Sequence, residues 1–141
     1  MRKLFLLGFV GMLSLAGSTQ AQAAAEPIPA AAQQAAETWL KLLDNNKWDE
    51  SWRTGAQVFR TAIKIEKWRL TGGKERKPFG RFLSRKLKTQ RMDPAKAGSP
   101  TLRNATFEYG AAFQFKKEAS ETVTASLEKD GKWRVSGYYI R

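Results

Sequence analysis

From residue 31 onward, apolar side chains recur every three or four positions, which is the spacing of one face of an α-helix. The first such stripe consists of Ala32, Ala36, Trp39 and Leu43. Asn45 and Asn46 follow it, and asparagine tolerates the left-handed backbone that commonly ends a helix. The pattern therefore predicts a helix from about residue 31 to this asparagine pair.

Two more helices are predicted between residues 47 and 78. Residues 47–60 read as one short helix, because three apolar residues lie four positions apart: Trp48, Trp52 and Ala56. The next helix is predicted from about residue 61, with three buried candidates: Ala62, Ile65 and Trp68. Gly72-Gly73 should weaken or end that helix, and Pro78 must stop it.

After Gly80 the pattern changes to the alternation of apolar and polar residues that is typical of strands. Residues 82–91 alternate weakly, with Leu83 and Leu87 on one side, and carry enough charge for an edge strand. One face of the next strand is predicted to hold Phe107, Tyr109, Ala111, Phe113 and Phe115. One face of the third is predicted to hold Val123, Ala125 and Leu127, opposite Thr122, Thr124 and Ser126. The last should place Trp133, Val135 and Tyr139 together.

The final two strands are predicted to join through a three-residue turn at residues 129–131. A two-residue turn at Asp130-Gly131 would mix apolar and polar faces, whereas the longer turn pairs Leu127 with Trp133. We therefore predict a type I turn with Gly131 in the left-handed region, forming a bulge. In this register Tyr138 and Arg134 point to the opposite face from Trp133.

Helices come first and antiparallel strands follow, which is the signature of an α+β fold. We expect about three N-terminal helices packed on one face of a curved four-stranded antiparallel sheet. The domain should span residues 31–141, after a linker at residues 24–30 that contains Pro27 and Pro29.

The first 23 residues are predicted to be a cleaved signal peptide. Arg2 and Lys3 precede an apolar run at residues 4–16, which is too short to span a membrane. Ala21 and Ala23 have the spacing that signal peptidase needs, so cleavage is expected after Ala23. We therefore expect a periplasmic or secreted bacterial protein.

The chain has no cysteine and no histidine. Packing alone must then hold an exported domain together, without disulfides. The usual ligands of zinc, copper and haem and the commonest general base are also missing, so we expect no metal, no cofactor and no catalytic residue.

Three stretches resemble the bacterial secreted family known as domain of unknown function 4019: residues 48–52, residues 84–88 and the C-terminal residues 121–141. The most specific part is the last strand, with Asp130, Gly131, Trp133, Arg134, Val135, Gly137, Tyr139 and Ile140. The resemblance covers about residues 35–141 and implies a cystatin-like or nuclear-transport-factor-like (NTF2-like) α+β cone. It transfers no catalytic residue, and the chain departs from the family pattern at residues 70–78.

Positive charge is concentrated in one segment of this basic protein. Residues 67–91 contain ten lysines and arginines and one acid, Glu75. The predicted anion-binding patch comprises Lys74, Arg76, Lys77, Arg81, Arg85, Lys86, Lys88 and Arg91. It would suit an anionic envelope component or an acidic protein, whereas export argues against nucleic acid. The alternative is a solvated face that serves solubility.

Aromatic residues in the interior of a cone could line a cavity for a small apolar ligand. The candidates are Trp48, Trp52, Tyr109, Phe113 and Tyr139. The alternative is that these rings fill the core, because a small domain without disulfides needs their buried area.

Two other functions stay open. An isomerase-like enzyme would need a carboxylate in the cone, but the predicted interior faces carry no Asp or Glu, and Glu121 is placed at a strand end. A structural module could instead form a homodimer through the exposed sheet face.

Overall fold

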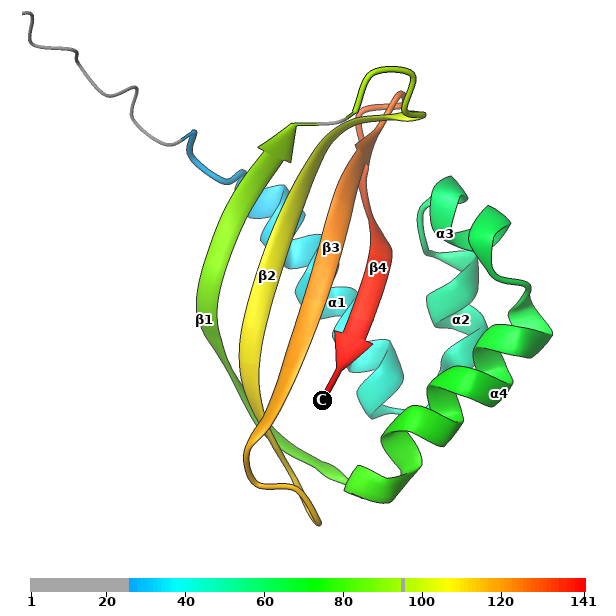
Figure 1. Cartoon of the computed structure of the whole chain (residues 1–141), viewed down its shortest axis with the longest axis vertical. Helices are drawn as coiled ribbons and strands as arrows, with labels where there is room; N and C mark the ends of the chain where they lie inside the picture. Colours follow the sequence, from blue (N-terminus) through cyan, green and yellow to red (C-terminus); the bar gives the residue numbers. More distant parts are fainter. Residues whose placement is uncertain (1–25, 95) are drawn as a thin grey trace, which may run out of the picture.

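The computed structural model describes residues 26–94 and 96–141, which fold into helices on one face of a four-stranded antiparallel sheet (Figure 1). The helices are α1 (Ala30–Asp44), α2 (Trp48–Arg53), α3 (Gln57–Ala62), α4 (Ile65–Arg76) and the short 3-10 helix η1 (Lys77–Phe79). The strands are β1 (Phe82–Pro94), β2 (Thr101–Phe113), β3 (Ala119–Glu128) and β4 (Trp133–Ile140), in that spatial order. The predicted α+β class is confirmed, although the sheet is not strongly curled.

Helix α1 crosses the sheet against β2, β3 and β4, while α2, α3 and α4 are grouped beyond β4 (Figure 1). Within the described ranges, no helix is both long enough and apolar enough to cross a membrane. The predicted signal peptide and its cleavage position at Ala23 lie outside the described residues.

The predicted stripe of the first helix is confirmed. Its apolar residues face the sheet and are buried: Ala32, Ala36, Trp39, Leu40 and Leu43. Asn46 has a positive φ of 58°, as expected for an asparagine that ends a helix. Five buried apolar positions on one face thus orient α1, whose C-terminal end, formed by Asp44, lies toward the lower end of the sheet in Figure 1.

The other two helix predictions were wrong at their boundaries. Residues 47–60 form two helices, because Ala56 is extended and donates its N–H to the Val135 carbonyl of β4 at 2.7 Å. The last helix begins at Ile65 and runs through Gly72-Gly73. A side chain at Gly72 would lie 2.7 Å from the Trp48 ring, so this glycine allows close helix packing rather than ending the helix.

The helices are held together by three tryptophans around the fully buried Ser51. Its carbonyl accepts the Trp39 indole N–H at 2.8 Å, and its hydroxyl accepts that of Trp68 at 3.0 Å. The Ser51 hydroxyl donates in turn to the Trp48 carbonyl at 2.6 Å. The indole N–H groups of Trp39 and Trp68 are therefore hydrogen-bonded, and the Trp48 ring packs against the core. The aromatic residues here fill the core.

The last hairpin has the predicted turn. Leu127 is opposite Trp133, Ala125 is opposite Val135, and Gly131 has a φ of 81°. The Gly131 N–H donates to the Glu128 carbonyl at 2.9 Å, as expected for the bulged turn.

Further along β4 the predicted facing of the side chains was wrong. The register shifts at Ser136, because Thr124 is opposite Gly137 whereas Ala125 is opposite Val135. This bulge turns Tyr138 into the core and leaves Tyr139 60 % exposed, the reverse of the prediction.

Two other apolar side chains also face solvent against expectation. Phe115 lies beyond the end of β2 and is 72 % exposed. Leu83 is exposed while Leu87 packs against the core, because β1 has an irregular register between Phe82 and Ser84. The prediction that β1 is an edge strand is confirmed.

Candidate functional site

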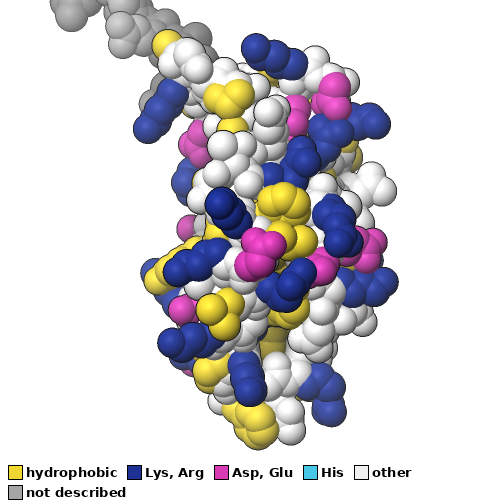
Figure 2. Space-filling model, turned by 90° about the vertical axis from the view of Figure 1, so that its right-hand side faces the viewer, with side chains coloured by type: hydrophobic (Ala, Val, Ile, Leu, Met, Phe, Trp, Pro, Cys, Tyr) yellow, Lys and Arg dark blue, Asp and Glu magenta, His cyan; other side chains and the backbone are white. Residues whose placement is uncertain are grey.

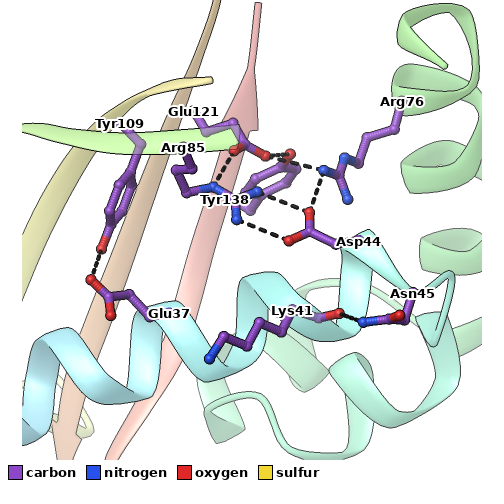
Figure 3. Close-up of polar contacts among 9 residues, drawn as sticks. All are labelled: Glu37, Lys41, Asp44, Asn45, Arg76, Arg85, Tyr109, Glu121 and Tyr138. Carbon is purple, nitrogen blue, oxygen red and sulfur yellow. Dashed lines mark hydrogen bonds and ion pairs between the residues drawn. The ribbon is translucent and has the colours of Figure 1, made fainter. Parts of the chain in front are cut away.

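Two arginines of the predicted basic patch are not on the surface. Their side chains are only 8 % exposed for Arg76 and 11 % exposed for Arg85, and both meet the carboxylates of Asp44 and Glu121 (Figure 3). Arg76 ends α4 and Asp44 ends α1, while Arg85 lies on β1 and Glu121 on β3. The ion network therefore joins four elements at the lower end of the sheet.

The contacts within this network are short and specific. Arg85 holds Asp44 with two hydrogen bonds of 2.9 Å and donates its Nε–H to Glu121 at 2.7 Å. Nη2 of Arg76 donates to Asp44 at 2.8 Å and to Glu121 at 3.4 Å. The Tyr138 hydroxyl donates to Glu121 Oε1 at 2.6 Å. Two positive and two negative groups thus balance in a nearly water-free site.

Glu121 corrects the expectation that the interior holds no acid. It is fully buried and shares the inward face of β3 with Val123 and Ala125. The alternation along residues 121–125 was the signal that could have found it, since a strand residue two positions from a core valine faces the core.

The network gives little support to acid–base catalysis. Each carboxylate already accepts hydrogen bonds from guanidinium groups, so its oxygen atoms are engaged in fixed pairs. Burial opposes charge on Arg85, but its hydrogen bonds to Asp44 and Glu121 outweigh burial and raise the pKa of Arg85. The arrangement therefore acts as an ionic tie between helices and sheet.

Two tyrosines next to carboxylates, the partly buried Tyr138 and the buried Tyr109, predict a loss of stability at alkaline pH. Burial, reinforced by Glu121, raises the pKa of Tyr138 above its ordinary value of 10.0. Burial, reinforced by Glu37, does the same for the pKa of Tyr109, whose hydroxyl contacts Glu37 at 3.5 Å (Figure 3). Above about pH 10 the unfolded chain loses these protons while the folded chain keeps them, so stability falls as pH rises.

The measurement is the free energy of unfolding in urea between pH 9 and pH 11. In Tyr138→Phe, the fall of the free energy of unfolding with pH should be smaller by about 1.4 kcal/mol per pH unit above pH 10. The matched control is Tyr139→Phe, which changes an exposed phenol and should keep the wild-type slope. An unchanged slope in Tyr138→Phe would contradict the prediction.

Beside the network lies a cleft of about 500 Å³ between the helices and the start of β1. Its lining residues come from α1, α2, α4, η1, the ends of β1 and β2 and the connections between these elements: Leu43, Asp44, Asn46, Trp48, Gly73, Arg76, Lys77, Gly80, Arg81, Phe82 and Phe113. The cleft therefore combines cationic groups with aromatic walls.

A second hollow, of about 780 Å³, lies on the sheet face that points away from the helices. Its charged lining residues are Lys86, Lys88, Lys116, Lys117, Arg141 and one acid, Glu118. Arg85 also borders the hollow, but its guanidinium group lies in the ion network. We call this hollow the basic groove. It joins β1 to the turn between β2 and β3, the turn that carries the exposed Phe115.

Residues 35–138 match the family described as "Protein of unknown function (DUF4019)". The chain belongs to the DUF4019 family. The matched region contains residues 48–52, residues 84–88 and the part of the last predicted segment up to residue 138, so the resemblance seen in the sequence is confirmed. It also contains the four ion-network residues and Tyr138. No curated protein matches the chain.

This DUF4019 chain divides the predicted basic patch among three places. Lys77 and Arg81 line the cleft with the buried Arg76, while Lys86 and Lys88 line the basic groove. Arg85 joins Arg76 in the ion network beside the cleft, and the remaining two residues, Lys74 and Arg91, are exposed elsewhere, on α4 and on β1. Sequence reasoning missed Lys116, Lys117 and Arg141, because they lie far from the 67–91 segment along the chain.

The five predicted cavity-lining residues also separate. Trp48 and Phe113 line the cleft, whereas Trp52 and Tyr109 pack with the core. Tyr139 points to solvent. The part of the chain that the structure describes holds no cluster of three or more acidic residues suited to a metal ion.

Proposed function

We propose that this DUF4019 protein is an exported, non-catalytic binding module that docks on an anionic lipid surface through its basic groove. The observation that carries the proposal is the turn between β2 and β3, where Phe115 is 72 % exposed beside Lys116 and Lys117. An exposed aromatic ring next to lysines suits the boundary between lipid headgroups and acyl chains.

The turn is held in place rather than left free. The Phe115 N–H donates to the Phe79 carbonyl at 2.9 Å, and the Gln114 N–H donates to the Arg81 carbonyl at 2.8 Å. The Lys116 ammonium lies 5.7 Å from the Phe79 ring centroid. Because the neighbouring η1–β1 connection fixes the backbone, little ordering is needed when the turn meets a surface.

Charge supports an anionic partner over a neutral one. Lys86 and Lys88 extend the positive field from the turn along β1, and the lining of the basic groove holds a single acid, Glu118. Figure 2 shows apolar atoms at the lower end of the molecule flanked by Lys and Arg side chains. A polymer or an acidic protein would use the lysines but would leave Phe115 without an apolar partner.

Export is part of the proposal, with cleavage after Ala23 and a periplasmic or secreted location. A cystatin-like or NTF2-like relationship also belongs to it, and the order of helices followed by a four-stranded antiparallel sheet supports that relationship.

The test is co-sedimentation of the purified protein with anionic and neutral lipid vesicles over a salt series. Binding to anionic vesicles should weaken as salt rises. Replacing both lysines, as Lys116→Gln with Lys117→Gln, should weaken it by about 30-fold, since each lysine near the surface contributes about 1 kcal/mol. Phe115→Ser should also weaken binding.

The matched control is Lys129→Gln with Lys132→Gln, which removes the same charge from the exposed turn at the other end of β3. This variant should bind like the wild type. Equal, salt-insensitive retention on neutral and anionic vesicles would overturn the proposal, as would binding to a soluble acidic polymer that does not need Phe115.

A further inference from the structure

We propose that the cleft beside the ion network binds a small organic acid. Its carboxylate would be held by Arg76, Lys77 and Arg81, and its apolar body would lie against Trp48, Phe82 and Phe113. This site is separate from the basic groove, because these residues lie on the side of the sheet that faces the helices.

The first reason is that Arg76 is mostly buried yet incompletely paired. A guanidinium group has five N–H donors. Only Nη2 of Arg76 donates to described residues, to Asp44 and Glu121. Its Nε is buried and has no acceptor within the described ranges. Nη1 donates to no residue within the described ranges and is not among the buried atoms, so it is the Arg76 donor that an acceptor in the cleft could reach. A carboxylate in the cleft would pair with this donor.

The second reason is the charge that the cleft presents. Asp44 is the acidic residue of the lining, and it is already held by Arg85 and Arg76 at 2.8–2.9 Å. The exposed side chains of Lys77 and Arg81 add positive charge at the rim without any carboxylate partner in the described part of the chain. A negatively charged group entering here would therefore meet net positive charge.

The third reason is the wall of the cleft, which argues for an amphipathic acid rather than a bare anion. Trp48, Phe82, Phe113 and Leu43 provide apolar surface. The Arg76 guanidinium carbon lies 4.9 Å from the Phe113 ring centroid, so this ring also positions the cation. Inorganic phosphate could use the donors but would leave the aromatic rings uncovered. A cleft of about 500 Å³ has ample room for an acid with one ring.

The experiment is a titration of ¹⁵N-labelled protein with 4-phenylbutanoate, followed by the backbone signals of Asn46, Gly73 and Arg81. The probes for comparison are 4-phenylbutanol, which lacks the charge, and inorganic phosphate, which lacks the ring. The acid should shift these signals in a saturable way and bind at least about tenfold more tightly than the alcohol, because charged hydrogen bonds are the stronger ones.

Two variants test the site without disturbing the ion network. Arg81→Gln should weaken binding of the acid by about tenfold and leave the alcohol unchanged. Gly73→Leu should block both probes, since a Cβ at Gly73 meets nothing within 4 Å and the side chain can fill the cleft without a clash. The matched control is Lys74→Gln, which removes an exposed charge next to Gly73 outside the lining of the cleft.

Unsaturated or absent shifts, equal affinity for acid and alcohol, or phosphate binding as tightly as the acid would each overturn the proposal. Loss of vesicle binding with acid binding intact would overturn only the lipid-docking function, because the two sites use different residues.

Discussion

Replacing Glu121 with glutamine is expected to lower the free energy of unfolding by about 3–5 kcal/mol, the cost of breaking a buried ion pair. The substitution keeps the size of the side chain but leaves Arg76 and Arg85 with one carboxylate, Asp44, in a site that is nearly closed to water. Urea unfolding followed by tryptophan fluorescence measures the effect.

The matched control is Glu118→Gln, which makes the same chemical change at an exposed position of the neighbouring turn and should alter stability very little. Tyr138→Phe should have an intermediate effect of about 1–2 kcal/mol near neutral pH, because it removes one hydrogen bond to Glu121 and no charge. A loss below about 1 kcal/mol in Glu121→Gln would show that the pairs are not coupled as the geometry indicates.

Replacing Gly80 with alanine is expected to cost about 2–4 kcal/mol of stability through backbone strain and a steric clash together. Gly80 joins η1 to β1 with φ 76° and ψ −156°, a conformation that is almost confined to glycine. A Cβ there would also lie 2.7 Å from the Phe115 ring and 2.9 Å from Gln114 Cβ. Thermal and urea unfolding both measure the loss.

Gly98→Ala separates the two contributions. Gly98 has nearly the same φ, 77°, but a Cβ at this position meets nothing within 4 Å. Gly98→Ala should therefore lower the free energy of unfolding only by the strain of left-handed backbone, about 1–2 kcal/mol. Equal losses at Gly80 and Gly98 would show that contact with Phe115 does not constrain the turn.

The sequence pattern predicted the parts of the fold in which one local rule acts without competition. The stripe of α1 and the turn at Gly131 were both confirmed, because apolar spacing and turn chemistry agreed there. The helix boundaries failed where tertiary contacts prevail over propensity. Ala56 leaves the helix to bond with β4, and Gly72 stays helical because Trp48 packs on it.

The site was less predictable than the fold, for two physical reasons. A bulge at Ser136 cannot be read from an alternating pattern, yet it places Tyr138 on the inward face and turns Tyr139 to solvent. Arginines in a basic segment are predicted to be exposed unless their acidic partners elsewhere in the sequence are known. Arg76 and Arg85 are buried because they pair with Asp44 and Glu121, which are distant in sequence. The sequence did contain one indication of the site, because Glu121 lies two positions from the core residue Val123 and therefore faces the core.

The span of the ion network along the chain has a consequence for the kinetics of folding. Its ion pairs join residues 32 to 45 positions apart, whereas each strand of the sheet pairs with its neighbour in the chain. The hairpins can therefore form through short loop closures, but these ion pairs must wait until helices and sheet have met. We expect these ion pairs to form after the transition state, and interactions of that kind slow unfolding rather than speed folding. The network should therefore prolong the lifetime of the native state.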